Sequence, residues 1–67
     1  MMTTVDILDI VELGYRHRAL RIVRREWLQE AANRLGVTAG ELSAFERGQI
    51  GMDWLAEHPQ VAREVGP

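Results

Sequence analysis

Arginine is the residue whose type and spacing point most directly to chemistry. All eight cations of the 67-residue chain are arginine, and five of them stand between residues 16 and 25. These five are Arg16, Arg18, Arg21, Arg24 and Arg25. A guanidinium stays charged and presents a planar fork of N–H donors that suits phosphate or carboxylate. The cluster could grip phosphate, dock an acidic partner, or form the solvated face of an amphipathic helix.

The arginine cluster stands between two acidic segments. Residues 1–15 carry a charge of −3, residues 16–25 carry +5 and residues 26–67 carry −4, for a net charge of −2. Nucleic-acid-binding domains are more often basic as a whole. Any such role must therefore rest on the local cluster.

The sequence gives little support for catalysis or for a bound cofactor. There is no cysteine, and the two histidines, His17 and His58, belong to no spaced set of metal ligands. We expect both histidines at the surface. Ser43, His17 and Asp53 could be named as a triad, but short helices offer no cleft that would bring them together. We expect no enzyme activity, no metal and no cofactor.

The chain also lacks segments that would send it to or across a membrane. No apolar run approaches the roughly 20 residues that a membrane-spanning helix needs. No basic segment precedes an apolar one at the N-terminus, so no signal peptide is visible. We expect a cytoplasmic protein made of one domain, residues 1–67.

Helical spacing of apolar residues runs along the chain from its start. Ile7, Leu8, Ile10 and Val11 predict a helix over residues 1–14, which Gly14 can end or bend. Residues 15–35 contain no glycine or proline and carry an apolar stripe that includes Trp27. This segment could be one long helix or two helices with a tight corner near residues 24–27. Trp27 and Trp54 are expected in the core.

The second half of the chain predicts shorter helices. Gly36 can end one helix, and Thr38 with Glu41 forms a capping box that starts the next, which ends at Gly48. Short helices follow over residues 52–67, interrupted near Pro59. No segment alternates as a strand would. The fold class is all-α, with four to five helices.

Residues 28–48 combine the features that a helix-turn-helix needs. Ala32 is small where two helices would cross, and Gly36 turns the chain. Apolar residues can fill the wedge between the helices: Ala31, Leu35, Val37, Leu42 and Phe45. The sequence therefore predicts a helix-turn-helix unit within the domain.

The same segment resembles a known family. Leu35-Gly36-Val37-Thr38, followed by Leu42-Ser43 and Phe45-Glu46-Arg47-Gly48, is similar to the helix-turn-helix of phage repressors, Cro proteins and xenobiotic-response-element-type bacterial regulators. The resemblance covers residues 16–48, and it implies a lambda-repressor-like fold. Trp27-Leu28 departs from the family, which usually has Ser or Thr followed by Gln at this place.

The resemblance implies a small transcriptional regulator, such as a repressor, of phage or mobile-element type. It would bind double-stranded DNA as a homodimer, and Arg21 would pair with Glu46 to support the fold. The recognition helix would present Thr38, Ala39, Gly40, Ser43, Ala44 and Arg47 to the bases. The backbone phosphates would be held by Arg18, Arg25 and Arg34.

A different class of function remains open. Ala39, Gly40, Ser43 and Ala44 make the recognition helix smooth, and smooth faces allow close helix packing. Together with the acidic balance, this favours a module that does not bind DNA but binds and inhibits another regulatory protein, as an antiactivator, an antitoxin-like inhibitor or an adaptor. The apolar stripe over residues 7–11 is expected to close a homodimer or to dock a partner.

Overall fold

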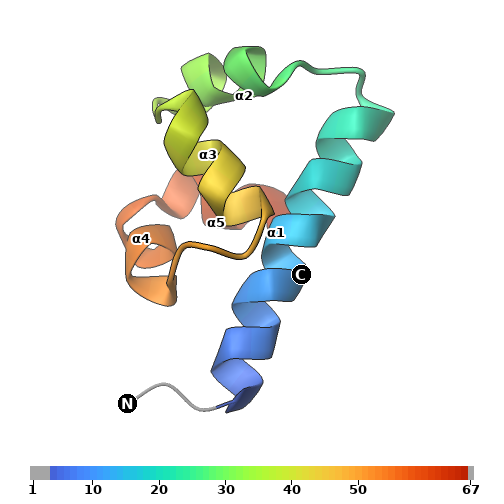
Figure 1. The fold of residues 1–67 in the computed structure, drawn as a ribbon. Helices are drawn as coiled ribbons and strands as arrows, with labels where there is room; N and C mark the ends of the chain where they lie inside the picture. The colour runs from blue at the N-terminus through green and yellow to red at the C-terminus, as the bar shows by residue number, and fades with distance from the viewer. Residues whose placement is uncertain (1–3, 67) are drawn as a thin grey trace.

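The computed structural model describes residues 4–66, with side chains described from residue 9 onward. It contains five α-helices: α1 (Thr4–Val23), α2 (Leu28–Leu35), α3 (Ala39–Glu46), α4 (Met52–Glu57) and α5 (Pro59–Val65). Figure 1 shows α1 as one long helix, with the four shorter helices gathered beside its second half. This part of the chain has no strand, and the predicted all-α class is confirmed.

Helix α1 runs without interruption through Gly14, so the expected separate helix over residues 1–14 is wrong. Gly14 lies where α1 crosses α3. A β-carbon at this position would stand 2.1 Å from the carbonyl oxygen of Phe45, which is far inside van der Waals contact. The glycine therefore permits the close approach of two helix backbones. This packing outweighs the roughly 1 kcal/mol by which glycine weakens a helix relative to alanine.

Residues 15–35 form two helices, and the corner between them is made by Arg25. Its φ is 56°, in the left-handed region that non-glycine residues rarely adopt. The Arg25 N–H donates to the Ile22 carbonyl at 3.0 Å, and the Glu26 N–H donates to the Arg21 carbonyl at 2.9 Å. These two bonds close α1 as a Schellman motif. Because the motif lacks its usual glycine here, the sequence could not separate one helix from two.

The next two helices end in the same way, but with the expected glycine. Gly36 and Gly48 both have a φ of 72°. Between them, the Thr38 hydroxyl accepts the Glu41 N–H at 3.0 Å, and the Glu41 carboxylate accepts the Thr38 N–H at 3.1 Å. The predicted capping box is present, and it fixes where α3 begins.

The core lies between α1, α2, α3 and the two C-terminal helices. Its buried apolar side chains are Ile10, Ala31, Ala32, Leu35, Leu42, Phe45, Leu55, Val61 and Val65. Trp54 packs against Phe45 with ring centroids 5.4 Å apart, and its indole N–H donates to Glu41 at 2.8 Å. Four of the five residues predicted to fill the wedge between α2 and α3 are buried, and the fifth, Val37, is partly buried.

Trp27, in contrast, is 77% exposed, and its expected place in the core is wrong. The expectation assumed that one helical phase continues from Leu20 past Val23 to Trp27. The corner at residues 24–27 breaks that phase, because Trp27 stands in extended backbone just before α2.

The N-terminal apolar stripe is described only in part. Ile10 is buried in the core and Val11 packs against it, whereas the side chains of Ile7 and Leu8 lie outside the described residues. The described half of the stripe thus covers the core of its own chain. Over residues 4–66, no helix is both long enough and apolar enough to span a membrane.

Candidate nucleic-acid interface

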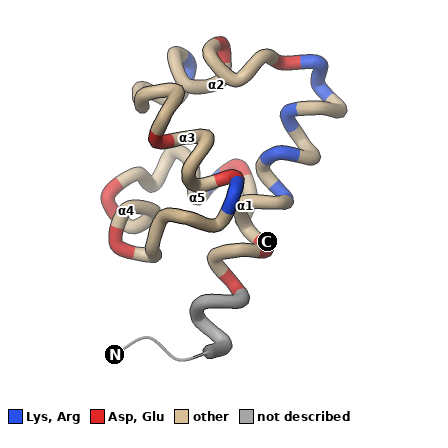
Figure 2. The backbone as a smooth tube through the Cα atoms, in the orientation of Figure 1, with Lys and Arg blue, Asp and Glu red and all other residues tan. Residues whose placement is uncertain are grey.

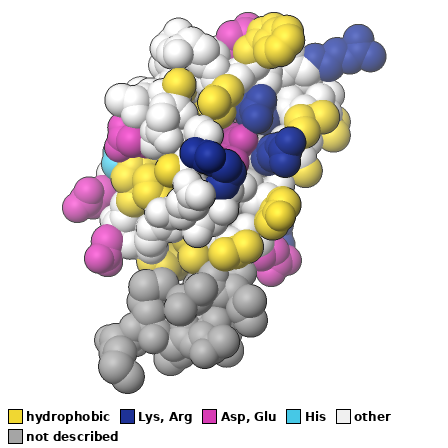
Figure 3. All heavy atoms as spheres, viewed as in Figure 1, with side chains coloured by type: hydrophobic (Ala, Val, Ile, Leu, Met, Phe, Trp, Pro, Cys, Tyr) yellow, Lys and Arg dark blue, Asp and Glu magenta, His cyan; other side chains and the backbone are white. Residues whose placement is uncertain are grey.

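A basic hollow lies between the end of α3 and the second half of α1. Its volume is about 260 Å³, and it is lined by Arg18, Arg21, Leu28, Ser43, Glu46 and Arg47. In Figure 3 dark blue side chains gather near the middle of the face that carries α3. The structure thus brings Arg18, Ser43 and Arg47, three of the predicted DNA contacts, to one place.

The other contacts predicted for the recognition helix do not line this hollow. Thr38 and Gly40 are exposed, whereas Ala39 and Ala44 are half-buried. The Thr38 hydroxyl accepts a hydrogen bond in the capping box, but its own proton remains able to donate. The Nε of Arg47 donates to the carbonyl oxygen of Ser43 within the same helix at 3.4 Å, which leaves its terminal nitrogens for a ligand.

Several arginines around the hollow are already engaged. Arg16 pairs with Glu12 at 3.2 Å and also donates to the Val65 carbonyl at 3.1 Å. Arg24 pairs with Glu64 at 3.2 Å. In Figure 2 blue arginine positions recur along the second half of α1. Within residues 9–66, no ion pair holds Arg18, Arg25 or Arg47.

The expected pair of Arg21 and Glu46 lies beneath the hollow. Arg21 binds the carboxylate through two nitrogens, with Nη2 2.9 Å from Oε1 and Nε 3.0 Å from Oε2. A third nitrogen of Arg21 donates to the backbone carbonyl of Glu26 at 3.1 Å, which ties the pair to the corner. This fork geometry holds α1 against the end of α3.

His17 completes the pair from the other side and was missed by the sequence reasoning. The expectation of a surface position is wrong, because His17 is only 1% exposed. Its Nδ1 lies 2.8 Å from Oε2 of Glu46, and its ring meets Phe45 edge-on, with centroids 5.9 Å apart. Once α1 is continuous, Ile10, Gly14 and His17 fall on the face that packs on α3. That periodicity across Gly14 was the signal available in the sequence.

Burial alone would raise the pKa of Glu46, because a charge is costly away from water. The hydrogen bonds from His17 and Arg21 outweigh this effect and hold the pKa below its usual range. Glu46 is therefore a carboxylate, and Nδ1 of His17 carries the proton that it donates. The Nε2 of His17 has no hydrogen-bond partner among the described residues, and its nearest carboxylate oxygen, on Glu64, is 3.6 Å away.

Arg34, which was predicted as a phosphate contact, does not line the basic hollow, and its guanidinium already has carboxylate partners. It binds both carboxylate oxygens of Glu26 at 2.8 Å and also pairs with Glu64. These hydrogen bonds raise the pKa of Arg34 and lower that of Glu26. Arg34 has these partners because it lies on the side of α2 that faces α5, where the carboxylates of Glu26 and Glu64 are within reach.

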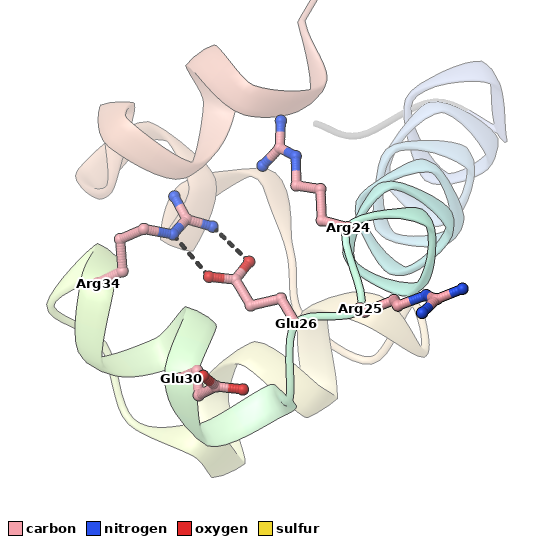
Figure 4. A pocket seen from close by; sticks show the side chains of 5 residues that line it. All are labelled: Arg24, Arg25, Glu26, Glu30 and Arg34. Carbon is pink, nitrogen blue, oxygen red and sulfur yellow. Dashed lines mark hydrogen bonds and ion pairs between the residues drawn. The ribbon is translucent and has the colours of Figure 1, made fainter.

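Figure 4 shows the hollow in which this network lies, with Arg34 and Glu26 joined and Arg25 pointing away from them. The hollow measures about 390 Å³ and is lined by Arg24, Arg25, Glu26, Glu30 and Arg34. It shares no lining residue with the basic hollow beside α3. Arg24 and Arg34 are paired with Glu64 and Glu26, and these ion pairs tie the corner and α5 to α2, whereas Arg25 has no ion pair to a described residue.

No group of three His, Cys, Asp or Glu side chains among the described residues is placed to hold a metal ion. Comparison of the chain with protein-family models, with curated proteins and with solved structures gave no match.

Proposed function

We propose that this protein is a small DNA-binding transcriptional regulator that places α3 in the major groove. One observation carries the proposal most directly: Arg18 from α1 and Arg47, which directly follows α3, converge with Ser43 on one hollow, and no described carboxylate pairs with either arginine. Helices α2 and α3 are short and are joined by a turn at Gly36, as a helix-turn-helix requires. The resemblance of residues 16–48 to phage repressors and Cro proteins supports the same function.

Each residue on this surface has a chemical role in the proposal. Helix α3 has eight residues, so it is about 12 Å long, comparable to the major groove that it would enter. Arg47 is the group suited to guanine O6 and N7, and Thr38 and Ser43 can bond to several base edges. Ala39 and Ala44 suit thymine methyl groups, and Gly40 lets the helix backbone come close. Arg18 and Arg25 would hold phosphates.

The internal ion pairs predict how strongly DNA affinity should depend on salt. Arg16, Arg21, Arg24 and Arg34 already have carboxylate partners, so they add little net positive charge. Arg18 and Arg25 leave about two phosphate contacts per protomer. Since each contact contributes about −0.9 to the slope of log affinity against log salt, we expect a slope near −2 per protomer. A homodimer of phage or mobile-element type would double this slope and read half-sites about 34 Å apart.

Salt dependence and three matched arginine variants test the proposal. Arg47→Ala should weaken binding to a preferred site by about 5- to 150-fold and relax preference at one base pair. Arg18→Ala should weaken all sequences alike and flatten the salt slope by about one unit. Arg63→Ala, on α5 and exposed, is the control and should leave both quantities unchanged. Absence of any shift on mixed DNA at about 50 mM salt would exclude DNA binding.

The second candidate function is binding and inhibition of another regulatory protein through the smooth face of α3. The extent of internal ion pairing favours it, because a chain with net charge −2 then offers few free cations to DNA. Ala44→Arg separates the two functions. The added bulk should block a protein partner, whereas on DNA an added arginine should tighten binding or leave it unchanged.

A further inference from the structure

The corner between α1 and α2 exposes three large apolar side chains. Ile22, Val23 and Trp27 are 57%, 80% and 77% exposed, and we call them the corner patch. Ile22 and Trp27 border a hollow of about 430 Å³, whose remaining lining is Arg21, Arg25 and Glu26. Soluble domains expose scattered apolar residues routinely, but a contiguous group that includes tryptophan is typical of an interaction site.

The indole of Trp27 is largely exposed, and the hydrogen bonds of Trp27 to described residues are made by its backbone. The backbone N–H of Trp27 donates to Glu30 at 2.9 Å, and its carbonyl accepts the Ala31 N–H at 3.0 Å. Both bonds would form with any side chain at this position. By contrast, the indole of Trp54 stacks on His58 and donates to Glu41, so the second tryptophan is fully used by the fold.

The rim of the corner patch is positively charged. Arg25 points away from the Glu26–Arg34 pair, as Figure 4 shows, and no described carboxylate pairs with it. Arg18 lies one helical turn before Ile22 and is likewise without an ion pair to a described residue. The nearby Glu26 turns its carboxylate to Arg34 on the other side of the corner. A partner approaching Trp27 therefore meets guanidinium groups that lack counter-charges.

We propose that the corner patch docks an acidic amphipathic segment of another protein. One large apolar side chain of the segment enters the hollow between Ile22 and Trp27, and its carboxylates pair with Arg25 and Arg18. Tryptophan and arginine are the residues that most often carry binding energy at interfaces, and a helix laid into a hydrophobic groove is a common mode of recognition.

A second copy of the chain fits this surface less well. Stable dimers bury about 800 Å² on each partner, and three side chains with one hollow offer much less. A short segment needs only a small site. Arg25 and Arg18 at the rim of the corner patch favour a segment with acidic residues beside its large apolar side chain.

The inference goes beyond the proposed regulator function and does not depend on it. The hollow at the corner patch and the basic hollow beside α3 share only Arg21 as a lining residue. Docking at the corner and reading of bases by α3 therefore use different apolar and base-reading side chains. Both proposals use Arg18 and Arg25, as partners for carboxylates in one and for phosphates in the other. Failure to bind DNA would remove the proposed function and leave this inference intact. Failure to bind an acidic segment would do the reverse.

The test uses the full chain labelled with ¹⁵N and a synthetic peptide of about 16 residues, long enough for about four helical turns. Leucine and phenylalanine follow the helical spacing of the peptide, and aspartate and glutamate fill the other positions. A scrambled peptide of the same composition is the control. We expect the indole N–H of Trp27 and the amides of residues 22–27 to shift on titration, while the indole N–H of Trp54 stays in place.

Paired variants assign the effect to the corner patch. Trp27→Ala should weaken peptide affinity by about tenfold or more, whereas Tyr15→Ala, which removes an exposed aromatic side chain from α1, should not change it. Arg25→Gly should weaken it several-fold and make it less sensitive to salt, with Arg63→Ala as the neutral control. Thermal denaturation of each variant shows that it folds. Because all four side chains are exposed, all four variants should do so.

Four results would overturn the inference. The first is no shift of the Trp27 indole N–H at about 1 mM peptide, the weakest binding of interest. The second is an equal response to the scrambled peptide. The third is a shift of the same signals on concentrating the protein alone, which would make the patch a self-association surface. The fourth is that a single-stranded oligonucleotide moves these signals while the peptide does not.

Discussion

Two regions of the molecule reverse the usual association between residue type and burial. At the crossing of α1 and α3, the ionisable side chains of His17 and Glu46 are 1% and 4% exposed. At the corner between α1 and α2, Trp27 is 77% exposed. Helical phase decides burial in both regions, because α1 continues through Gly14 and ends before Trp27.

The carboxylate of Glu46 can be buried at the crossing because both of its oxygens accept hydrogen bonds. Glu46 accepts from Arg21 through two nitrogens and from His17 through one. Such a buried pair fixes geometry more surely than it adds stability, but breaking it leaves a charge without compensation. At the corner, no comparable network covers the indole, and the arginines at its rim remain without ion pairs to described residues.

The largest contrast should come from deleting one aromatic side chain in each region. Phe45→Ala removes a fully buried ring and should lower the free energy of unfolding by about 3–5 kcal/mol, which is most of what so small a domain has. Trp27→Ala should change it by less than about 0.5 kcal/mol, because the ring is exposed. Urea denaturation followed by circular dichroism measures both. Equal losses for the two variants would contradict the contrast.

The second contrast concerns pH. Burial would raise the pKa values of Glu26, Glu46 and Glu64, but hydrogen bonds hold all three below the ordinary value of 4.5. These bonds come from Arg34 to Glu26 and Glu64, and from His17 and Arg21 to Glu46. A carboxyl whose pKa is lowered by folding contributes stability that is complete above pH 4.5 and is lost as pH falls through the folded-state pKa. We therefore expect stability to fall steeply in acid below that value.

Glu46→Gln shows how much of the pH dependence of stability comes from Glu46 at the crossing of α1 and α3. At pH 7 it should cost about 3 kcal/mol, because it leaves Arg21 without its counter-charge. Its stability should also fall less between about pH 5 and pH 2, since one titrating carboxyl is gone. The control Asp53→Asn, exposed on α4, should keep the wild-type slope. A variant as steep as wild type would show that Glu46 does not carry the effect.

The sequence predicted those parts of the fold that local chemistry determines. Gly36, Gly48 and the Thr38–Glu41 capping box fixed the ends of α2 and α3, and the apolar residues between them marked the wedge. The Arg21–Glu46 pair was expected from a family resemblance. Among the proposed DNA contacts, only Arg34 is held elsewhere, by carboxylates from Glu26 and Glu64 that are distant in sequence or across a turn.

The remaining features depend on contacts between distant segments, which spacing alone does not show. Gly14 reads as a helix breaker until α3 is seen against it, and His17 reads as a surface residue until Glu46 is beside it. Arg25 gives no sign of a corner, because arginine rarely adopts a positive φ. Spacing alone therefore could not show that His17 is buried or that Trp27 is exposed.

A third contrast compares two glycines in helices. Gly14→Ala places a β-carbon 2.1 Å from the Phe45 carbonyl oxygen, so α1 and α3 must move apart. We expect a loss of about 1–3 kcal/mol in the free energy of unfolding. Gly40→Ala, whose β-carbon would meet nothing closer than 4.0 Å, should instead stabilise α3 by up to about 1 kcal/mol. Thermal denaturation distinguishes them, and a stabilising Gly14→Ala would refute the close crossing.

The smallest expected effect lies at the corner itself. Arg25 holds a φ of 56°, which costs a non-glycine residue about 1–2 kcal/mol, and glycine would remove that cost. Glycine also gives the unfolded chain more freedom, which returns about 0.5–1 kcal/mol to the unfolded state. Arg25→Gly should therefore stabilise the protein by about 0.5–1 kcal/mol, measured by urea denaturation, and no lost ion pair to a described residue opposes the gain. Arg24→Gly, one residue earlier, is the matched control and should destabilise, because Arg24 pairs with Glu64 at 3.2 Å. If Arg25→Gly destabilised the protein instead, the guanidinium would be bonded within the fold, and neither DNA nor an acidic segment could count on it.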